Sequence, residues 1–366
     1  MQMDVNGIKQ HVLPHYLTAA ELEYANLTVA PLGNGHINST WLVSSNQRRM
    51  VLQQLNTQVF TSPWSVVENA MVIANFLQQQ TDNYALLLTY PVLTLAGQLA
   101  VEDAQHGFWR AISFVENSHS IEKMHTTEQA QQTAYAFGTF AAALGQMDTQ
   151  QLQQTIPDFR HLAARLQRLQ QVAQDDPQQR RQHCLQWLAF AESQRALLDE
   201  VAEMEAKLPL RICHNDTKIN NLLFDADNQP MAVVDLDTCM PGYLMYDFGD
   251  MVRSCCASVA EDATQLAEID VLPDYFAAIS QGWLQALAPV MTPLERDSLW
   301  LGVKVVTLML AVRFLTDYLD GDRYFRIHHA EHNLERAINQ FTLYQRFVEH
   351  QDQLQPLLQA DPIFAE

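Results

Sequence analysis

The chain carries little positive charge. Of its 366 residues, 22 are Lys or Arg and 42 are Asp or Glu, which gives a formal net charge of −20 at pH 7. A surface with this balance repels the phosphate backbone of nucleic acids and gives little attraction to anionic lipid headgroups. We therefore expect neither nucleic acid nor a membrane as a partner, and the oligomeric state is left open.

Cysteine is scarce and shows no pattern. The five cysteines are an odd number, and no two of them have the CxxC spacing of a redox or zinc motif. The N-terminal segment also lacks the basic region followed by a continuous apolar stretch that marks a secretory signal. These features predict reduced, mostly buried thiols in a cytoplasmic protein.

Long apolar runs without charge are missing as well. The longest apolar segment, residues 298–319, contains Lys304 and Arg313, so we expect a buried core helix rather than a membrane span. Hydrophobic residues still make up 48% of the chain, enough for a sizeable core. The length favours two domains or one large domain with two lobes.

Strand patterns and helix patterns occupy different parts of the chain. Short β-branched and apolar runs separated by turn residues fill most of the first third, where only residues 62–80 repeat at helical spacing. Residues 127–206 and 243–350 read mainly as helices. The expected strands are residues 26–33, 37–44, 49–56, 84–95 and 108–116. We predict an α+β fold with a small β-rich lobe (residues 1–116) and a large helical lobe (residues 117–366).

A dense polar cluster lies within the second lobe. The apolar run 231–234 should be a strand that ends at Asp235, and residues 222–224 should be its hairpin partner. A hairpin of this length brings Asn221, before one strand, beside Asp235, after the other. Asp216 lies on the loop just before Asn221.

This arrangement suits phosphoryl transfer. One carboxylate can accept the proton of an attacking hydroxyl, while an amide oxygen and a second carboxylate hold Mg²⁺ against the phosphates of ATP. Magnesium prefers hard oxygen ligands and few protein contacts. The cluster therefore predicts a kinase with ATP and Mg²⁺ as cofactors.

The spacing of the cluster is that of a known motif. His214-x-Asp216-x-x-x-x-Asn221 matches the kinase catalytic loop H-x-D-x-x-x-x-N, and Asp235 and Asp247 follow in the expected order. In these residues the chain resembles the aminoglycoside phosphotransferase family of small-molecule kinases, and most of all its N-acetylhexosamine 1-kinases. Residues 51–63 and 313–325 resemble further segments of the same kinases.

The resemblance implies a two-lobed, protein-kinase-like fold and a role for each motif residue. The implied roles are catalytic base for Asp216, Mg²⁺ ligands for Asn221 and Asp235, support of the loop for His214 and Asp247, and contact with the transferring phosphate for Lys218.

The resemblance also points to the nucleotide site, in the first lobe. In PLGNGHINSTW, residues 31–41, Gly33 and Gly35 would let backbone N–H groups approach the phosphates. His36 and Asn38 would contact either the nucleotide or the sugar. Gln53 stands where many kinases carry the lysine that grips the phosphates, so the way the phosphates are held is open.

The acceptor site is expected near the end of the long apolar helix. Arg313 and Asp317 share a helix face at i, i+4 spacing, so they either contact the acceptor or form an internal ion pair. The resemblance favours acceptor contact for Arg313, and Tyr324 could supply a surface for a sugar ring. Asp237 is equally compatible with a place near Mg²⁺ and with capping a turn.

The resemblance implies ATP- and Mg²⁺-dependent phosphorylation of a sugar hydroxyl, in first place the anomeric hydroxyl of an N-acetylhexosamine. Two alternatives stay open. The acidic surface would attract cationic acceptors, as in a kinase of amino-alcohols or aminoglycosides. The missing lysine would fit a catalytically silent protein that binds a nucleotide or a sugar.

Overall fold

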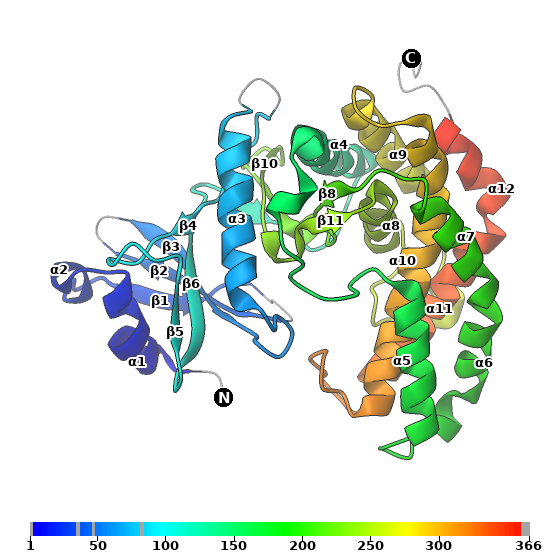
Figure 1. The fold of residues 1–366 in the computed structure, drawn as a ribbon, viewed down its shortest axis with the longest axis horizontal. Helices are drawn as coiled ribbons and strands as arrows, with labels where there is room; N and C mark the ends of the chain where they lie inside the picture. Colours follow the sequence, from blue (N-terminus) through cyan, green and yellow to red (C-terminus); the bar gives the residue numbers. More distant parts are fainter. Residues whose placement is uncertain (1–2, 34–36, 46–47, 81–83, 360–366) are drawn as a thin grey trace.

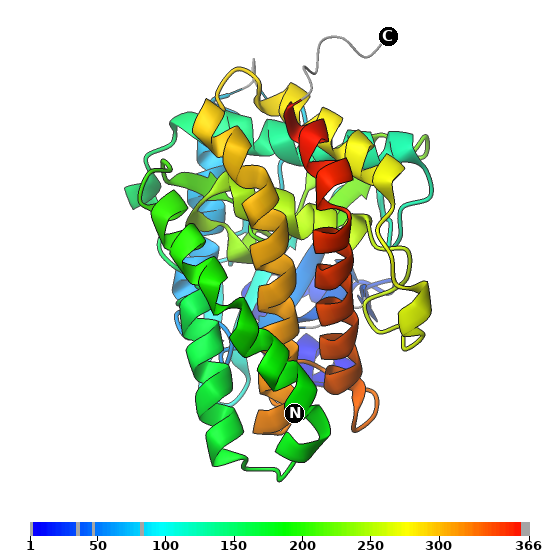
Figure 2. The same ribbon diagram turned by 90° about the vertical axis from the view of Figure 1, so that its right-hand side faces the viewer.

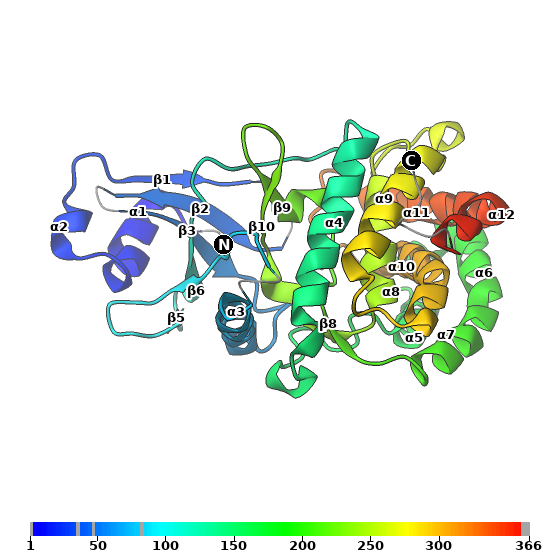
Figure 3. The same cartoon turned by 90° about the horizontal axis from the view of Figure 1, so that it is seen from above.

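The computed structural model describes residues 3–33, 37–45, 48–80 and 84–359. Figure 1 shows two lobes, one built around a β-sheet from the first third of the chain and a larger one built mainly of helices. Helix α3 (Pro63–Gln78) lies on the side of the sheet lobe that faces the helical lobe, which is clearest from above in Figure 3. The expected α+β class with two lobes is therefore confirmed.

One antiparallel sheet organises the first lobe. Its strands lie in the order β1-β2-β3-β6-β4, and β5 also pairs with β6. The strands are β1 (Thr28–Pro31), β2 (Ser39–Ser44), β3 (Arg49–Leu55), β4 (Pro91–Val92), β5 (Ala100–Asp103) and β6 (Gly107–Ser113). One face, which includes Trp41, Val43, Met50 and Leu52, is buried beneath the N-terminal segment with α1 (Val5–Gly7) and α2 (Ala19–Leu22).

The register of this sheet puts three polar side chains in a row on its other face. Thr40 on β2 pairs with Gln53 on β3, and Gln53 pairs with Arg110 on β6. Residues directly opposite each other on neighbouring strands point to the same side of a sheet. This row faces the helical lobe, because Arg110 forms an ion pair with Asp237 there.

One expected strand of the first lobe is largely wrong. Within residues 84–95 only Pro91 and Val92 form a strand, and Leu87, Leu93 and Leu95 are exposed. The backbone N–H of Leu87 donates instead to the carbonyl of Met231 in the other lobe, at 2.7 Å. Because the segment crosses from one lobe to the other, its leucines do not pack together on one face of the sheet.

Helix α10 forms the centre of the helical lobe. Its neighbours α5, α8 and α11 pack along it, and Figure 2 shows α10 in orange with α11 in red beside it. The helices of this lobe are α4 (Thr127–Ala143), α5 (Leu162–Asp175), α6 (Leu185–Ser193), α7 (Leu197–Glu205), α8 (Leu244–Cys255), α9 (Pro273–Leu287), α10 (Pro293–Asp320), α11 (His332–Glu349) and α12 (Gln351–Leu354). Although α10 is long and apolar enough to cross a membrane, 78% of its most apolar window is buried inside the protein, as expected of a core helix.

Two glycines let α8 lie directly against α10. A Cβ atom on Gly302 would stand 1.9 Å from the carbonyl oxygen of Met245, and one on Gly249 would stand 2.3 Å from the carbonyl oxygen of Gly302. Neither position therefore accepts a side chain without moving the helices apart. The close contact fixes α8, which carries Asp247.

Two small sheets hold the polar cluster. Strand β8 (Arg211–Cys213) pairs with β11 (Met240–Gly242), and β9 (Leu222–Phe224) pairs with both β10 (Pro230–Val233) and β7 (His119–Ser120). The loop 214–221 connects β8 to β9. Because β7 already belongs to the sheet of the helical lobe, the chain has left the first lobe before residue 119. We therefore propose that the boundary between the two lobes lies between residues 116 and 117.

Candidate active site

The loop 214–221 is anchored by the buried carboxylate of Asp247. The backbone N–H groups of His214 and Asn215 donate to its two oxygens at 2.9 and 2.7 Å. The hydroxyl of Thr217 donates to the carbonyl of Asp247 at 2.6 Å. Helix α8 thus sets the backbone of the loop, and the interlocked glycines set α8.

The side chain of His214 is buried and supports its surroundings. Its Nε2 lies 2.9 Å from the carbonyl oxygen of Val234, and the backbone N–H of Asp216 donates to its Nδ1 at 3.3 Å. The ring meets Phe137 and Phe140 edge-on. His214 therefore joins the loop to the end of β10, as the resemblance implies.

Asp216 lies among groups that favour its ionised form. Asn221 donates to Asp216 Oδ2 at 2.8 Å, and Lys218 Nζ lies 3.3 Å from Oδ1. Burial alone would raise the pKa of Asp216, but the charges of Lys218 and His214 and the Asn221 hydrogen bond lower it to about 2. Asp216 is thus ionised at neutral pH, and its role as the base stays a prediction. Lys218 contacts the Asp216 carboxylate, and its expected contact with the phosphate stays a prediction as well.

Asp235 lies directly beside Asn221. The backbone N–H of Val234 donates to the carbonyl of Asn221 at 2.9 Å, and Asp235 follows with a left-handed backbone (φ 59°). The Asp235 residue is exposed, but desolvation by the surrounding protein, and then the nearby charges of Asp237 and Asp216, raise the pKa of its carboxyl to about 7. Carboxylates gathered in this way favour a divalent cation, which relieves their repulsion.

The amide of Asn221 completes the set of ligand atoms. Its nitrogen donates both to the carbonyl and to the carboxylate of Asp216, at 2.8 Å each. Its oxygen is left for a cation, so Asn221 and Asp235 together offer the hard oxygens that Mg²⁺ takes. The residues therefore fit the metal site expected from the sequence.

Asp237 joins the two lobes. It is 2% exposed, it accepts from Asn38 Nδ2 at 2.8 Å, and it forms an ion pair with Arg110. The amide oxygen of Asn38 accepts in turn from the backbone N–H of Asn56 at 3.0 Å. Both polar atoms of the Asn38 side chain have partners within the protein, and its expected ligand contact stays a prediction.

Gln53 is also fully engaged. Its Nε2 donates to the hydroxyl of Thr40 at 3.1 Å, and its Oε1 accepts from Nε and Nη2 of Arg110 at 2.9 and 2.7 Å. Gln53 thus holds a guanidinium group, and its expected contact with the nucleotide stays a prediction. Sequence reasoning missed Arg110, whose signal was a single cation inside the apolar strand pattern of residues 108–116.

The glycine-containing turn is described only in part. Gly33 has a left-handed φ of 69°, and among the described residues, its chain neighbours aside, no atom lies within 4 Å of the place where its Cβ would be. The backbone here is open to a ligand, as a phosphate-binding turn requires. Gly35 and His36 lie outside the described residues, so their expected ligand contacts stay predictions.

Comparison with known proteins agrees with this geometry. The sequence signature of the phosphotransferase enzyme family matches residues 28–287. The chain belongs to this family. The matched range takes in the glycine turn, Arg110, the loop 214–221 and Asp235. The family consists of kinases that use ATP and Mg²⁺ and act on alcohol groups, so the expected enzyme class and cofactors are confirmed.

Solved structures of small-molecule kinases share the whole fold of this phosphotransferase. The choline kinase of Cryptosporidium parvum is 14% identical, with a TM-score of 0.62 and coverage of 97% of this chain and 99% of that one. A microcompartment-associated aminopropanol kinase is 15% identical, with a TM-score of 0.58 and coverage of 95% and 98%. Spectinomycin phosphotransferase in complex with ADP and spectinomycin is 13% identical, with a TM-score of 0.54 and coverage of 98% and 99%. At these identities the likeness shows the kinase-like fold, not the acceptor.

On helix α10 of the phosphotransferase, Arg313 lies against three aromatic rings. Its guanidinium lies over Phe159, Tyr324 and Phe325, at 5.1, 5.1 and 5.3 Å from the ring centroids. The hydroxyl of Tyr324 is buried and has no hydrogen-bond partner among the described residues. Buried hydroxyls normally have a partner, so this one is available to a ligand.

Asp317 does not pair with Arg313. Its two oxygens accept from the backbone N–H groups of Arg323, Tyr324 and Phe325, at 2.8 to 2.9 Å, and from the amide of Asn333 at 2.9 Å. The carboxylate is 6% exposed and shapes the turn that carries Tyr324. We therefore remove Asp317 from the proposed acceptor contacts and also discard the ion-pair alternative.

Two further arginines, also missed in the sequence, lie between the loop and Arg313. Arg160 donates to the carbonyl of Asn215 and lies 3.4 Å from Asp250. Arg165, on α5, forms no ion pair with a described residue, and its Nε is buried without a partner there. Burial and then Arg313 lower the pKa of Arg165 to about 10, so it keeps its charge at neutral pH.

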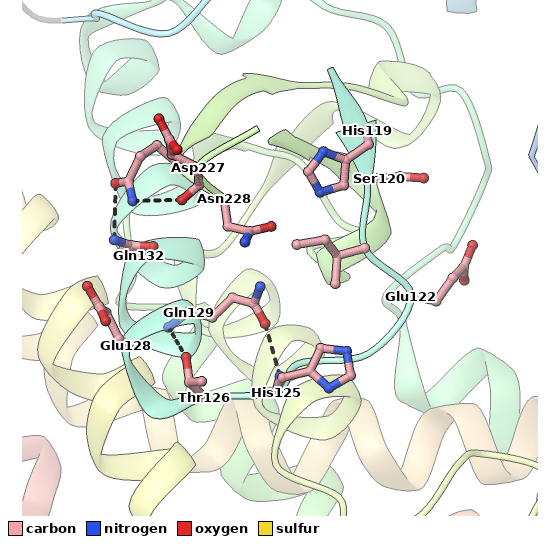
Figure 4. A pocket seen from close by; sticks show the side chains of 12 residues that line it. His119, Ser120, Glu122, His125, Thr126, Glu128, Gln129, Gln132, Asp227 and Asn228 are labelled. Atoms are coloured by element: carbon pink, nitrogen blue, oxygen red, sulfur yellow. Dashed lines mark hydrogen bonds between the residues drawn. The ribbon is translucent and has the colours of Figure 1, made fainter. Parts of the chain in front are cut away.

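A hollow of about 600 Å³ lies away from these residues. It is formed by β7, the start of α4 and the turn of the β9–β10 hairpin, and its lining includes His119, Glu122, His125, Glu128 and Asp227. Figure 4 shows these polar side chains around it. None of the catalytic-loop residues lines this hollow, so we do not place the reaction there.

Proposed function

We propose that this phosphotransferase transfers the γ-phosphoryl group of ATP to the anomeric hydroxyl of N-acetylglucosamine or N-acetylgalactosamine. The product is the sugar 1-phosphate. The observation that carries this choice of acceptor is the cluster of Arg313, Arg165 and the Tyr324 hydroxyl. It combines two cations and aromatic rings with hydrogen-bond donors, Arg165 Nε and the Tyr324 hydroxyl, that have no partner among the described residues.

Asp216 is the base of the proposed reaction. It accepts the proton of the sugar hydroxyl while the sugar oxygen bonds to the γ-phosphorus and the bond to the bridging β-phosphate oxygen breaks. An anomeric hydroxyl is more acidic than an ordinary alcohol, so Asp216 need only assist its deprotonation as the new bond to phosphorus forms. Asn221 and Asp235 would hold Mg²⁺, which neutralises charge on the phosphate oxygens.

The acceptor end of the site favours a neutral over a cationic acceptor. The protein has a net charge of −20, yet Arg165 and Arg313 lie together without ion pairs to described residues. A protonated amine placed beside them would be repelled, and an N-acetyl group would not. This argues against the choline-like and aminoglycoside-like acceptors of the structural neighbours.

The catalytically silent alternative has less support. A protein that only binds its ligands has no need for an ionised base held between Lys218 and Asn221, nor for two oxygen ligands in register beside it. Asp216, Asn221 and Asp235 are all present and adjacent. The missing lysine alone does not favour this alternative.

The deciding experiment measures ADP release with ATP and Mg²⁺ over a panel of acceptors: N-acetylglucosamine, N-acetylgalactosamine, glucosamine, choline and kanamycin. We expect turnover on the two N-acetylated sugars. In Asp216→Asn, kcat should fall by about 10²- to 10⁴-fold because the base is lost, while ATP affinity stays near that of the wild type. Asp227→Asn, at the exposed tip of the hairpin, is the matched control and should keep full activity.

Other outcomes are equally informative. Turnover limited to choline or kanamycin would replace the hexosamine proposal with a kinase of cationic acceptors. If ATP bound but no acceptor were phosphorylated, the result would favour a catalytically silent protein that binds a nucleotide or a sugar. Asp216→Asn with wild-type kcat would show that Asp216 is not the base.

A further inference from the structure

The nucleotide end of the site lacks the expected cation on its central strand. Strand β3 (Arg49–Leu55) has Gln53 at the position where many kinases carry a lysine. Between residues 1 and 116 the Lys and Arg residues are Lys9, Arg48, Arg49 and Arg110. One of these four would have to supply a phosphate-binding charge from the sheet lobe.

Three of the four are engaged elsewhere. Lys9 donates to the carbonyl of Leu27 at 3.4 Å. Arg48 donates to the carbonyl of Tyr16 and lies 3.7 Å from Glu21. Arg49, the third of these residues, is also paired within the sheet lobe.

Arg49, at the start of β3, forms an ion pair with Glu116 and lies over the ring of Phe114 at 4.3 Å. Its side chain is 36% exposed. None of these contacts is with a residue of the catalytic cluster, which leaves Arg110.

Arg110 lies on the face of the sheet that is turned toward the cluster. It is directly opposite Gln53 in the β3–β6 register, and the Gln53 amide oxygen accepts from its Nε and Nη2. Its Nη2 also forms the ion pair with Asp237, which stands two residues after the metal ligand Asp235. Nη1 has no hydrogen bond to a described residue. The guanidinium belongs to a residue that is 2% exposed, it is held in place by two residues, and it keeps one nitrogen without a partner among the described residues.

We propose that Arg110 takes the role of the missing strand lysine and binds the nucleotide phosphates, with Gln53 and Asp237 holding its guanidinium in position. A planar guanidinium is well suited to phosphate oxygens, and fixing it beforehand reduces the entropy lost on binding. The glutamine on β3 is then a holder for a cation on the next strand, and its presence does not imply loss of activity. The inference rests on the use of ATP by this family and does not depend on the acceptor.

The test is calorimetric binding of ATP, ADP and adenosine without acceptor, with and without Mg²⁺. We expect Arg110→Met to weaken ATP and ADP by about 10- to 100-fold, as for the loss of charge-assisted hydrogen bonds to phosphate. Adenosine affinity should not change, because adenosine has no phosphate. Arg110→Lys should recover part of the ATP affinity, since it keeps the charge.

Two controls separate binding from folding. Arg49→Met removes an exposed cation from the same lobe and should leave all three affinities unchanged. Arg110→Met leaves the buried carboxylate of Asp237 without its ion-pair partner and could unfold the protein. The double variant Arg110→Met/Asp237→Asn removes that carboxylate charge as well, so ATP binding can still be measured on a folded protein.

Wild-type ATP affinity in a folded Arg110 variant would overturn the proposal. An equal loss of ATP and adenosine affinity would overturn it as well, because it would show a structural role. Absence of sugar turnover in the acceptor panel would leave this inference intact, since the binding experiment contains no acceptor.

Discussion

At the scale of single residues, position decides what an arginine does. Arg165 and Arg168 lie one turn apart on α5. Arg168 is exposed and pairs with Asp320 at 3.0 Å, a contact of the kind that adds little to stability. Arg165 is half-buried beside Arg313 and forms no ion pair with a described residue, an arrangement that costs free energy unless a ligand uses it.

This contrast gives a prediction for acceptor choice. In Arg165→Gln, the preference for N-acetylglucosamine over glucosamine, expressed as a ratio of kcat/KM values, should fall by about tenfold, because one charge repelling the protonated amine is lost. Arg165→Lys keeps the charge and should keep the preference. Arg168→Gln is the control on the same helix, and its ratio should equal that of the wild type. A ratio that does not change in Arg165→Gln would remove Arg165 from the acceptor site.

The residues that could be predicted from the sequence are those tied to one another by short spacing. Asp216 and Asn221 lie on one loop, and a single hairpin brings Asp235 beside them. Arg110 could not be found in this way, because its meeting with Asp237 depends on how the two lobes pack. The i, i+4 spacing of Arg313 and Asp317 was misleading for a similar reason, since the turn after α10 supplies closer donors to the carboxylate.

At the scale of secondary-structure elements, the N-terminus of α10 is tied to the strand that leads into the catalytic loop. Thr292 and Glu295 cap each other's backbone N–H groups there. Glu295 also accepts from Arg211 on β8, at 2.8 and 3.0 Å. Burial acts to raise the pKa of Glu295, but the hydrogen bonds from Arg211 and Thr292 lower it overall below its usual 4.5.

The sign of this shift predicts how stability depends on pH. Because the folded pKa is below the unfolded one, the stabilisation is complete above about pH 4.5 and is lost as the pH falls through the folded value. Glu295→Gln should therefore lower stability by about 3 kcal/mol at pH 7, the scale of a broken buried ion pair. The difference from the wild type should shrink below pH 4.5.

Thermal melting between pH 3.5 and pH 7 measures this. Glu349→Gln, which breaks the exposed pair of Glu349 with Arg346, is the matched control and should melt like the wild type at every pH. A Glu295→Gln deficit that stays constant down to pH 3.5 would contradict the role assigned to the ionised carboxylate.

Helices and strands whose apolar residues repeat at a clear spacing could be predicted from the sequence, and those without such a repeat could not. Helix α3 begins at Pro63, within the range expected from its helical repeat, β1, β2 and β3 lie within their expected runs, and β6 begins one residue before its own. Residues 84–95 are rich in leucine but have little alternation, so composition alone suggested a strand. The short helices before residue 23 left no repeat long enough to recognise.

At the scale of the whole molecule, the site is made by two lobes that meet at the buried carboxylate of Asp237. Arg110 and Asn38 reach Asp237 from the sheet lobe, and Asn69 on α3 donates to the carbonyl of Cys239 at 3.2 Å. Before any cation binds, three negative charges lie near one another there, and their repulsion lowers the stability of the folded protein. They belong to Asp216, Asp235 and Asp237. Such an arrangement sacrifices stability for function.

This trade-off predicts opposite effects of one substitution with and without ligand. Asp235→Asn should raise the melting temperature of the free protein, because it removes the carboxylate whose pKa is raised to about 7 by desolvation in the surrounding protein and by the charges of Asp237 and Asp216. With ATP and Mg²⁺ at about 100 times the dissociation constant, the wild type should gain about 2.7 kcal/mol of stability, and the variant should lose the part of this gain that depends on Mg²⁺. Melting curves of both proteins with ATP alone and with ATP plus Mg²⁺ separate the two effects. If Mg²⁺ stabilised Asp235→Asn as much as the wild type, the metal would have to bind elsewhere. If the free variant melted below the wild type, repulsion among the three carboxylates would not be the dominant electrostatic feature of the empty site.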